Sequence, residues 1–302
     1  MKKVFFTTIG CLFFLSSYAC DICGCGLSAR SFGILPQFKG NFIGLKAQYK
    51  NFDSVHPPLF DSQLPEYSSE YYYNAELWGR WNPLKKLQLF YFIPYQRAVK
   101  IEDGHQNVYA GLGDITMMAN YIILNTAESS DKSWKHALQS GGGVKIPTGK
   151  YNIRENDGSL VMNVQPGSGA FSFPVNLIYT LRYDKLGLNT DFNYTFNTGN
   201  KNGFRFGDRS QGGIKLFYWQ EWEHLSILPA AGLIYQHAAP DRESSELLVG
   251  SGGYSWNASF SADLYYQNFS LGLAVQLPVS QHLTDGNVRL RNNFSTTLIY
   301  NF

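Results

Sequence analysis

The chain has 302 residues, of which 16% are charged and 16% are aromatic, and its formal net charge is +2. Soluble proteins have about 25% charged residues, so this composition is unusual for a chain whose whole surface faces water. The charges are scattered and nearly balanced, which excludes the basic surface that a nucleic-acid-binding protein needs.

The first 19 residues are predicted to be a signal peptide. Lys2 and Lys3 precede an apolar segment at residues 4–15, and Ser17-Tyr18-Ala19 places small residues at the two positions that signal peptidase reads. Cleavage is therefore expected before Cys20, and the mature chain is exported to the cell envelope.

Residues 20–40 are predicted to be a cysteine-containing periplasmic head or plug. Cys20, Cys23 and Cys25 lie in one short segment, and no cysteine follows them, so they do not staple distant parts of a fold. Thiolates prefer soft ions, which makes the three cysteines candidate ligands for Cu(I) or Zn(II). A local disulfide with one spare thiol and lipidation of Cys20 are left open as alternatives.

Residues 41–302 are predicted to form an all-β, transmembrane antiparallel β-barrel of about 12 strands. No later apolar run is long enough for a spanning helix, and a closed barrel is the other backbone that satisfies its hydrogen bonds in lipid. Many segments alternate apolar and polar residues with a period of two, as a strand between lipid and water requires. The predicted strands are residues 43–50, 69–81, 85–97, 109–124, 135–147, 168–183, 186–197, 204–220, 224–237, 251–266, 269–280 and 291–302.

The connections between these strands alternate in length. Long loops are centred near residues 60, 103, 157, 200, 245 and 285. The turns at Asn82-Pro83, Asp184-Lys185, Glu221-Trp222-Glu223 and Gln267-Asn268 are tight, and the connection near residue 130 is of medium length. Bacterial barrels have even strand numbers, short periplasmic turns and long extracellular loops. The pattern therefore predicts a protein of the Gram-negative outer membrane with its N-terminus in the periplasm.

The last strand carries a predicted assembly signal. Leu298, Tyr300 and the terminal Phe302 lie on one face at a period of two, with Ile299 as the exception to the alternation. Such an ending is similar to the C-terminal recognition signal of outer-membrane barrels. The predicted partners are therefore the outer-membrane lipid and the barrel assembly machinery.

The polar face of the strands predicts a charged barrel lumen. Both signs occur in near balance, so we expect a paired polar network without strong ion selectivity. Twelve strands imply a passage narrow enough for residues 20–40 to plug. The charged residues predicted to point inward are Lys46, Lys50, Glu70, Glu76, Arg80, Asp114, Lys145, Arg182, Asp191, Lys215 and Asp263.

Three short motifs lie where predicted strands meet loops. They are Gly111-Leu112-Gly113-Asp114-Ile115, Lys145-Ile146-Pro147-Thr148-Gly149 and Gln165-Pro166-Gly167-Ser168-Gly169. With these motifs the chain resembles the outer-membrane family named for the MetA pathway of phenol degradation, and its cysteine head looks like that of Bacteroidota members. The resemblance implies a transporter-like barrel. Phe171 and Ser172 stand where an acidic residue is expected, and the motif glycines are interpreted as residues that shape the backbone.

The predicted function is an outer-membrane channel or transporter for small solutes, with apolar molecules among the candidates. Soft-metal handling of copper or zinc through the cysteines is the alternative, and an outer-membrane enzyme such as a phospholipase is a third. None of the six histidines lies in a recognisable nucleophile motif, so no catalytic residue is assigned and the protein is predicted not to be an enzyme.

Overall fold

The computed structural model describes residues 40–56, 65–126, 133–154 and 162–302. The signal peptide, the cysteines at positions 20, 23 and 25, and almost all of the predicted head lie outside the described residues. In the part that is described, no helix is long and apolar enough to cross a membrane.

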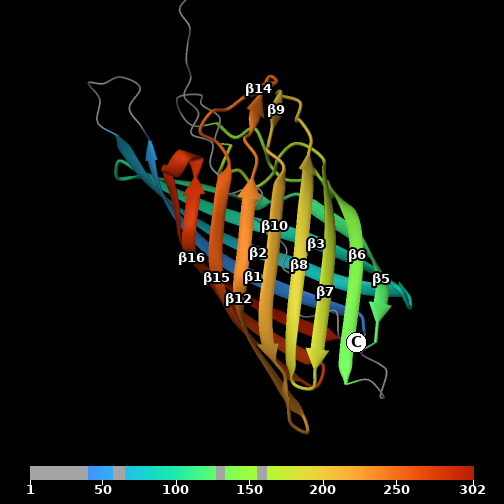
Figure 1. The fold of residues 1–302 in the computed structure, drawn as a ribbon. Helices are drawn as coiled ribbons and strands as arrows, with labels where there is room; N and C mark the ends of the chain where they lie inside the picture. The colour runs from blue at the N-terminus through green and yellow to red at the C-terminus, as the bar shows by residue number, and fades with distance from the viewer. Residues whose placement is uncertain (1–39, 57–64, 127–132, 155–161) are drawn as a thin grey trace, which may run out of the picture.

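Twelve antiparallel strands close into one barrel, as the alternation predicted (Figure 1). Each main strand pairs with its neighbours in the wall, and β1 pairs with β17 to close the cylinder. The wall strands are β1 (Phe42–His56), β2 (Glu66–Leu84), β3 (Leu87–Glu102), β5 (Ile115–Asn125), β6 (Trp134–Ile146), β7 (Ser172–Tyr183), β8 (Leu186–Asn197), β10 (Arg209–Tyr218), β12 (Leu225–Ala238), β15 (Gly253–Tyr266), β16 (Phe269–Leu283) and β17 (Val288–Asn301).

Shorter elements lie at the two ends of the barrel. β4 (His105–Leu112) lengthens the wall beside β3, and β11 (Gln220–Glu221) pairs with the start of β12. β9 (Phe204–Arg205), β13 (Arg242–Glu243) and β14 (Glu246–Leu247) form a small separate sheet, and η2 (Thr284–Gly286) is a single 3-10 turn. In Figure 1, β9 and β14 lie at the end opposite to the C-terminus, which we call the loop end. The other end is the turn end.

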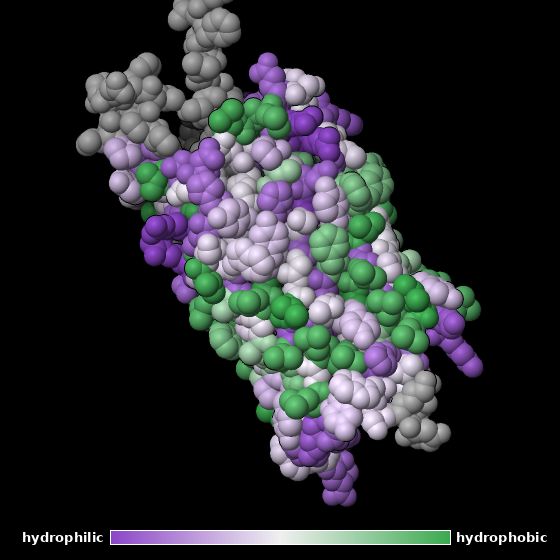
Figure 2. Space-filling model, viewed as in Figure 1, coloured by the Kyte–Doolittle hydropathy of each residue, from purple (hydrophilic) through white to green (hydrophobic). Residues whose placement is uncertain are grey.

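The outer surface of the wall is apolar. Leu45, Met117, Leu177, Phe260 and Leu298 are all strongly exposed, although side chains of this kind are normally buried in water-soluble proteins. Figure 2 shows hydrophobic side chains gathered over the wall between more hydrophilic ends. Exposed tryptophans and tyrosines near the tight turns, such as Trp81, Trp222 and Tyr266, match the aromatic girdle of a membrane barrel. The wall is therefore built to face lipid.

Two predicted strand boundaries are wrong, one at the turn end and one within the wall. β2 continues through Asn82-Pro83, and the chain turns at Lys85-Lys86 instead. A register shift between Trp81 and Leu84 absorbs the proline, because a residue without an N–H fits at a bulge. The predicted strand at residues 109–124 is interrupted at Gly113-Asp114, so that β4 and β5 are two pieces that both pair with β3.

Two further strands begin later than predicted. Residues 168–171 are not part of β7, because Ser168 is held by Asp114 and Gly169 has a positive φ of 70° that ends the extended backbone. Residues 204–208 are not part of β10, because Phe204 and Arg205 pair with β13 in the small sheet at the loop end. Both differences arise from tertiary contacts, which the alternation of residues along a strand does not predict.

Deletion of Phe302 is expected to lower the amount of folded barrel in the outer membrane. The Phe302 N–H donates to the carbonyl of Asn41 at 2.9 Å, and its ring stacks beside that of Tyr300, so the residue ends the β17–β1 seam that closes the cylinder. Heat-modifiable migration of outer-membrane fractions measures the folded amount. Truncation of the exposed Val249 side chain to alanine at the loop end is the control, and equal folded amounts for all three proteins would remove the assembly role.

Candidate functional site

The connection between β6 and β7 folds into the barrel. Loops normally run over the surface of a protein, yet Met162, Val164, Gln165 and Ala170 in this connection are buried, and Val164 is only 1% exposed. We call residues 162–171 the inward loop. Its burial means that it occupies space inside the cylinder.

Val164 marks the position of the inward loop. It belongs to one buried apolar cluster with residues from the side of the wall opposite β6 and β7, the two strands that the loop connects. Its carbonyl accepts a hydrogen bond of 3.4 Å from Nε2 of Gln96 on β3. The cluster partners are Phe52, Tyr72, Ala98, Tyr109, Ala238, Leu283, Val288 and Leu290. Because these come from β1, β2, β3, β4, β12, β16 and β17, the loop crosses the lumen toward its loop end.

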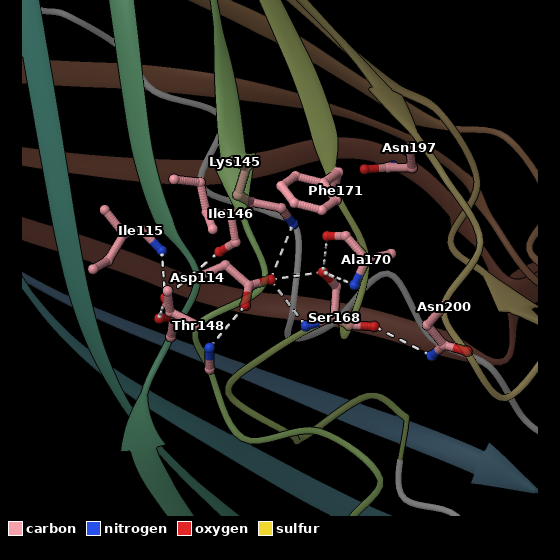
Figure 3. A network of polar contacts seen from close by, with 12 residues as sticks. Asp114, Ile115, Lys145, Ile146, Thr148, Ser168, Ala170, Phe171, Asn197 and Asn200 are labelled. Atoms are coloured by element: carbon pink, nitrogen blue, oxygen red, sulfur yellow. Dashed lines mark hydrogen bonds and ion pairs between the residues drawn. The ribbon is translucent and has the colours of Figure 1, made fainter.

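Asp114 anchors the inward loop to the wall (Figure 3). One carboxylate oxygen accepts the N–H of Gly149 at 3.0 Å. The other accepts the N–H of Ser168 at 2.9 Å and its hydroxyl at 2.6 Å, and Nζ of Lys145 lies 3.6 Å away. Asp114 is 6% exposed, so its charge is balanced by these donors and by Lys145 rather than by bulk water.

Thr148 and Ser168 extend this network to neighbouring segments. The Thr148 hydroxyl donates to the carbonyl of Gly113 and accepts the N–H of Ile115, both at 3.0 Å, so it bridges the break between β4 and β5. The Ser168 carbonyl accepts a hydrogen bond from Nδ2 of Asn200, which lies in the loop before β9. The network therefore joins the wall, the inward loop and the next loop.

Glycine is required where the loop meets the wall. A Cβ on Gly149 would lie 2.7 Å from Cα of Gly167 and 2.9 Å from the carbonyl carbon of Gly113, and a Cβ on Gly167 would lie 2.5 Å from the Gly149 carbonyl. Backbone atoms cannot move aside as a flexible side chain does, so only glycine allows this close approach.

The three sequence motifs thus meet at one place. Gly113 and Asp114 come from the first motif, Thr148 and Gly149 from the second, and Ser168 from the third. The glycines do shape the backbone as interpreted. Asp114 was predicted only as one of several lumen charges, because its spacing from Ser168 gives no signal that the two residues form a pair.

A second buried carboxylate organises the loop end. Asp241 accepts the N–H of Gly207, and its own N–H donates to the hydroxyl of Ser251, which donates to the carbonyl of Leu248. Beside this arrangement, an apolar cluster joins the inward loop to the other segments of the loop end. The cluster consists of Met162, Phe204 and Phe206, with Leu248 packed against it.

The structure places the predicted inward-facing charges in buried or half-buried positions. Arg80 donates to the carbonyl of Gly40 and lies over the ring of Phe42 at 5.1 Å, and Glu70 accepts the hydroxyl of Tyr72 at 2.7 Å. The buried members are Lys50, Glu70, Glu76, Arg80, Asp114, Asp191 and Lys215, and the half-buried members are Lys46, Lys145, Arg182 and Asp263. Lys215 interacts electrostatically with both Asp191 and Asp263, and Gly232 on the neighbouring strand leaves room for its side chain.

The interior also contains an apolar cluster that the alternation pattern did not predict. It lies toward the turn end, and its rings include Trp78 and Phe92, whose centroids are 6.0 Å apart in nearly parallel planes. Its members are Phe42, Trp78, Phe90, Phe92, Met118, Ile178 and Ile299. The alternation predicts apolar side chains outside and polar side chains inside, so it does not predict inward aromatic residues. Two residues break the alternation and could have signalled the cluster: Ile299 in the last strand, and Trp78, which shares its face with Glu76 and Arg80.

The remaining predicted site residues are placed as follows. Leu298, Tyr300 and Phe302 are exposed on the outer face of the barrel end. Cys20, Cys23 and Cys25 lie outside the described residues. Within residues 40–56, 65–126, 133–154 and 162–302, no group of three His, Cys, Asp or Glu side chains is arranged to hold a metal ion.

One serine, histidine and carboxylate do lie together near the loop end. Nε2 of His56 is 2.9 Å from the hydroxyl of Ser68 and 3.5 Å from Oε1 of Glu102. A hydrolase triad needs the nucleophile and the orienting group at opposite ring nitrogens. Here both contacts involve the same nitrogen and Ser68 is 3% exposed, so this arrangement is not that of a triad.

No family model matches the chain, and no curated protein matches it by sequence. The fold is similar to that of the COG4313 outer membrane channel from Pseudomonas putida F1, with a TM-score of 0.65 and 14% identity over 87% of this chain and 96% of that one. The β domain of the Bordetella autotransporter BrkA gives a TM-score of 0.49 at 10% identity, over 87% of this chain and 100% of that one. A mutant of the TodX monoaromatic hydrocarbon channel gives a TM-score of 0.48 at 9% identity, over 88% of this chain and 91% of that one. Fold and lipid-facing wall together define a transmembrane β-barrel of the outer-membrane class.

Proposed function

We propose that the protein is an outer-membrane channel for small solutes and that the inward loop sets the width of its passage. The observation that carries the proposal is the burial of Val164 among residues from the side of the wall opposite β6 and β7, which means that the loop spans the lumen. A barrel of this size otherwise encloses a continuous space, and a loop anchored across it narrows that space. The similarity of the fold to an outer-membrane channel supports the same class of function.

The orientation follows from the general construction of such barrels. Short turns face the periplasm and long loops face the outside, so the turn end is assigned to the periplasm and the inward loop to the extracellular half. A solute would meet the cluster around Val164 first and the aromatic cluster around Trp78 and Phe92 later. Apolar side chains along the path favour small solutes with apolar parts.

Solute entry into liposomes tests the channel function. Proteoliposomes should swell in small neutral solutes such as glycerol and in small aromatic alcohols, and should swell far less in disaccharides, because the inward loop restricts the passage. Protein-free liposomes and liposomes with heat-denatured protein are the controls. Swelling no faster than in these controls for every solute would contradict the proposal.

A second candidate function is soft-metal handling by the mature N-terminus. It is supported by the spacing of Cys20, Cys23 and Cys25, which lets several thiolates reach one Cu(I) or Zn(II) ion without help from the barrel. Under reducing conditions the purified protein should bind Cu(I) stoichiometrically, and a variant with all three cysteines changed to serine should not. Equal uptake by the two proteins would exclude this function and leave the channel proposal untouched.

A further inference from the structure

We propose that the turn end of the barrel carries a binding site for small aromatic carboxylates, built on Arg182 and Trp219. The inference rests on the proposed channel function and deepens it, because the site lies where a solute would leave the passage toward the periplasm. It is separate from the inward loop, which lies toward the opposite end.

The site is a cavity of about 460 Å³, a volume within the usual range for small-molecule pockets. Lys135, Arg182 and Lys185 all line it, together with Trp219. Two carboxylates, Asp184 and Glu221, line it as well, so its cations exceed its anions by one. A cavity with this balance attracts a monoanion.

Strand pairing brings the cations together. Lys135 on β6 is the register partner of Arg182 on β7, and Lys185 lies in the two-residue turn that follows β7. The N–H of Trp219 donates to the carbonyl of Lys185 at 2.6 Å, which ties the end of β10 to the same turn. The position of each group is therefore fixed by the wall and not by a long flexible loop.

Arg182 has donor capacity left for a ligand. Its Nε is buried and makes no hydrogen bond within the described part of the chain, and an unsatisfied buried donor is costly until an acceptor reaches it. Among the described residues, none of Lys135, Arg182 and Lys185 forms an ion pair; Lys185 instead donates to Oε1 of Gln220 at 3.1 Å. Arg182 lines the cavity, and the terminal amino groups of a guanidinium recognise a planar carboxylate through paired hydrogen bonds.

Trp219 supplies an aromatic surface beside the cations. The guanidinium carbon of Arg182 lies 5.8 Å from its ring centroid, and the Tyr265 ring stacks on it at 5.6 Å with an interplanar angle of 28°. Buried Phe217, Leu228 and Ala230 hold this pair of rings in place. A ligand that carries an aromatic ring next to its carboxylate can contact the aromatic and the cationic parts of the site at once.

The experiment uses the full-length protein in planar bilayers, with benzoate added on the side of the turn end. Benzoate should interrupt the current reversibly at lower concentration than acetate, which lacks the ring, or benzyl alcohol, which lacks the charge. Arg182→Gln should raise the half-blocking concentration of benzoate about tenfold or more, because a charge-assisted bidentate contact is lost. Trp219→Leu should remove the preference for benzoate over acetate. Lys201→Gln, the same charge change at an exposed position of the loop end, should leave the block unchanged.

The outcomes separate this inference from the proposed function. The inference is overturned if the wild type conducts but benzoate does not block it, or if benzoate blocks Arg182→Gln as strongly as it blocks the wild type. Either result leaves the channel proposal intact. A wild type that does not conduct contradicts the channel proposal, and benzoate binding is then measured by equilibrium dialysis of the folded protein in detergent. The site is supported if the protein binds benzoate in detergent and if Arg182→Gln, but not Lys201→Gln, weakens this binding. Absence of binding overturns the inference. If Arg182→Gln folds poorly, Arg182→Lys replaces it in the test; this variant keeps the charge without the planar fork and should still raise the half-blocking concentration above that of the wild type.

Discussion

Replacing Asp114 with asparagine is expected to release the inward loop and to raise the single-channel conductance severalfold. The carboxylate accepts three hydrogen bonds from Gly149 and Ser168, and the amide that replaces it would direct an NH₂ group at one of these donors. A hydrogen bond to a charged group contributes about 1.5–3 kcal/mol. The loss of one or two such bonds therefore shifts the equilibrium from the anchored toward the released loop by on the order of 100-fold. Conductance in planar bilayers measures the result.

Asp103→Asn is the matched control for this substitution. Asp103 lies in the exposed turn between β3 and β4, so the same chemical change there removes no buried contact. Heat-modifiable migration must show that both variants are folded. If Asp114→Asn is folded and conducts as the wild type does, the carboxylate does not hold the loop in the passage.

Gly149→Ala is expected to displace the inward loop with little effect on the barrel wall. The added Cβ would lie 2.7 Å from Cα of Gly167 and 3.0 Å from Cα of Gly113, and strain against backbone costs roughly 1–3 kcal/mol or more. The amides of Gly167 and Ser168 are hydrogen-bonded in the anchored loop. Hydrogen exchange measured by mass spectrometry should therefore accelerate in the peptide that contains these residues, and not in the wall strands.

Gly111→Ala is the control, because its Cβ would lie 3.5 Å from the nearest atom of Pro166, an ordinary contact. The two glycines belong to neighbouring motifs, so the comparison isolates the close approach of the backbones. Unchanged exchange in Gly149→Ala would mean that the contact with Gly167 is not what positions the loop.

The wall could be predicted from the sequence because its cause is local. In strands such as β8, lipid and interior impose a period of two on side chains such as Phe192 and Asn193, and both are placed as the pattern indicates. Closure of the cylinder follows from the count of such strands and from the regular alternation of long and tight connections. Both the period of two and the lengths of the connections can be read from residues that are close together in the sequence.

The inward loop could not be predicted in the same way. Its position depends on contacts between segments far apart in the chain, such as Asp114 with Ser168 and Asp241 with Gly207. β7 begins later than the sequence predicts for the same reason, since residues 168–171 are held by the anchor at Asp114. Inward-facing Trp78 and Phe92 were missed because a membrane pattern assigns aromatic residues to lipid.

The central claim is that the inward loop restricts the passage, and one variant tests it most directly. The N–H of Gly167 donates to the carbonyl of Lys150 at 2.8 Å, so residues 151–166 can be replaced by a short Gly-Ser linker without moving either end or the Asp114 anchor. The single-channel conductance of this variant should exceed that of the wild type severalfold, with the same heat-modifiable migration. A folded variant with the wild-type conductance would contradict the claim, because the passage would then be limited elsewhere.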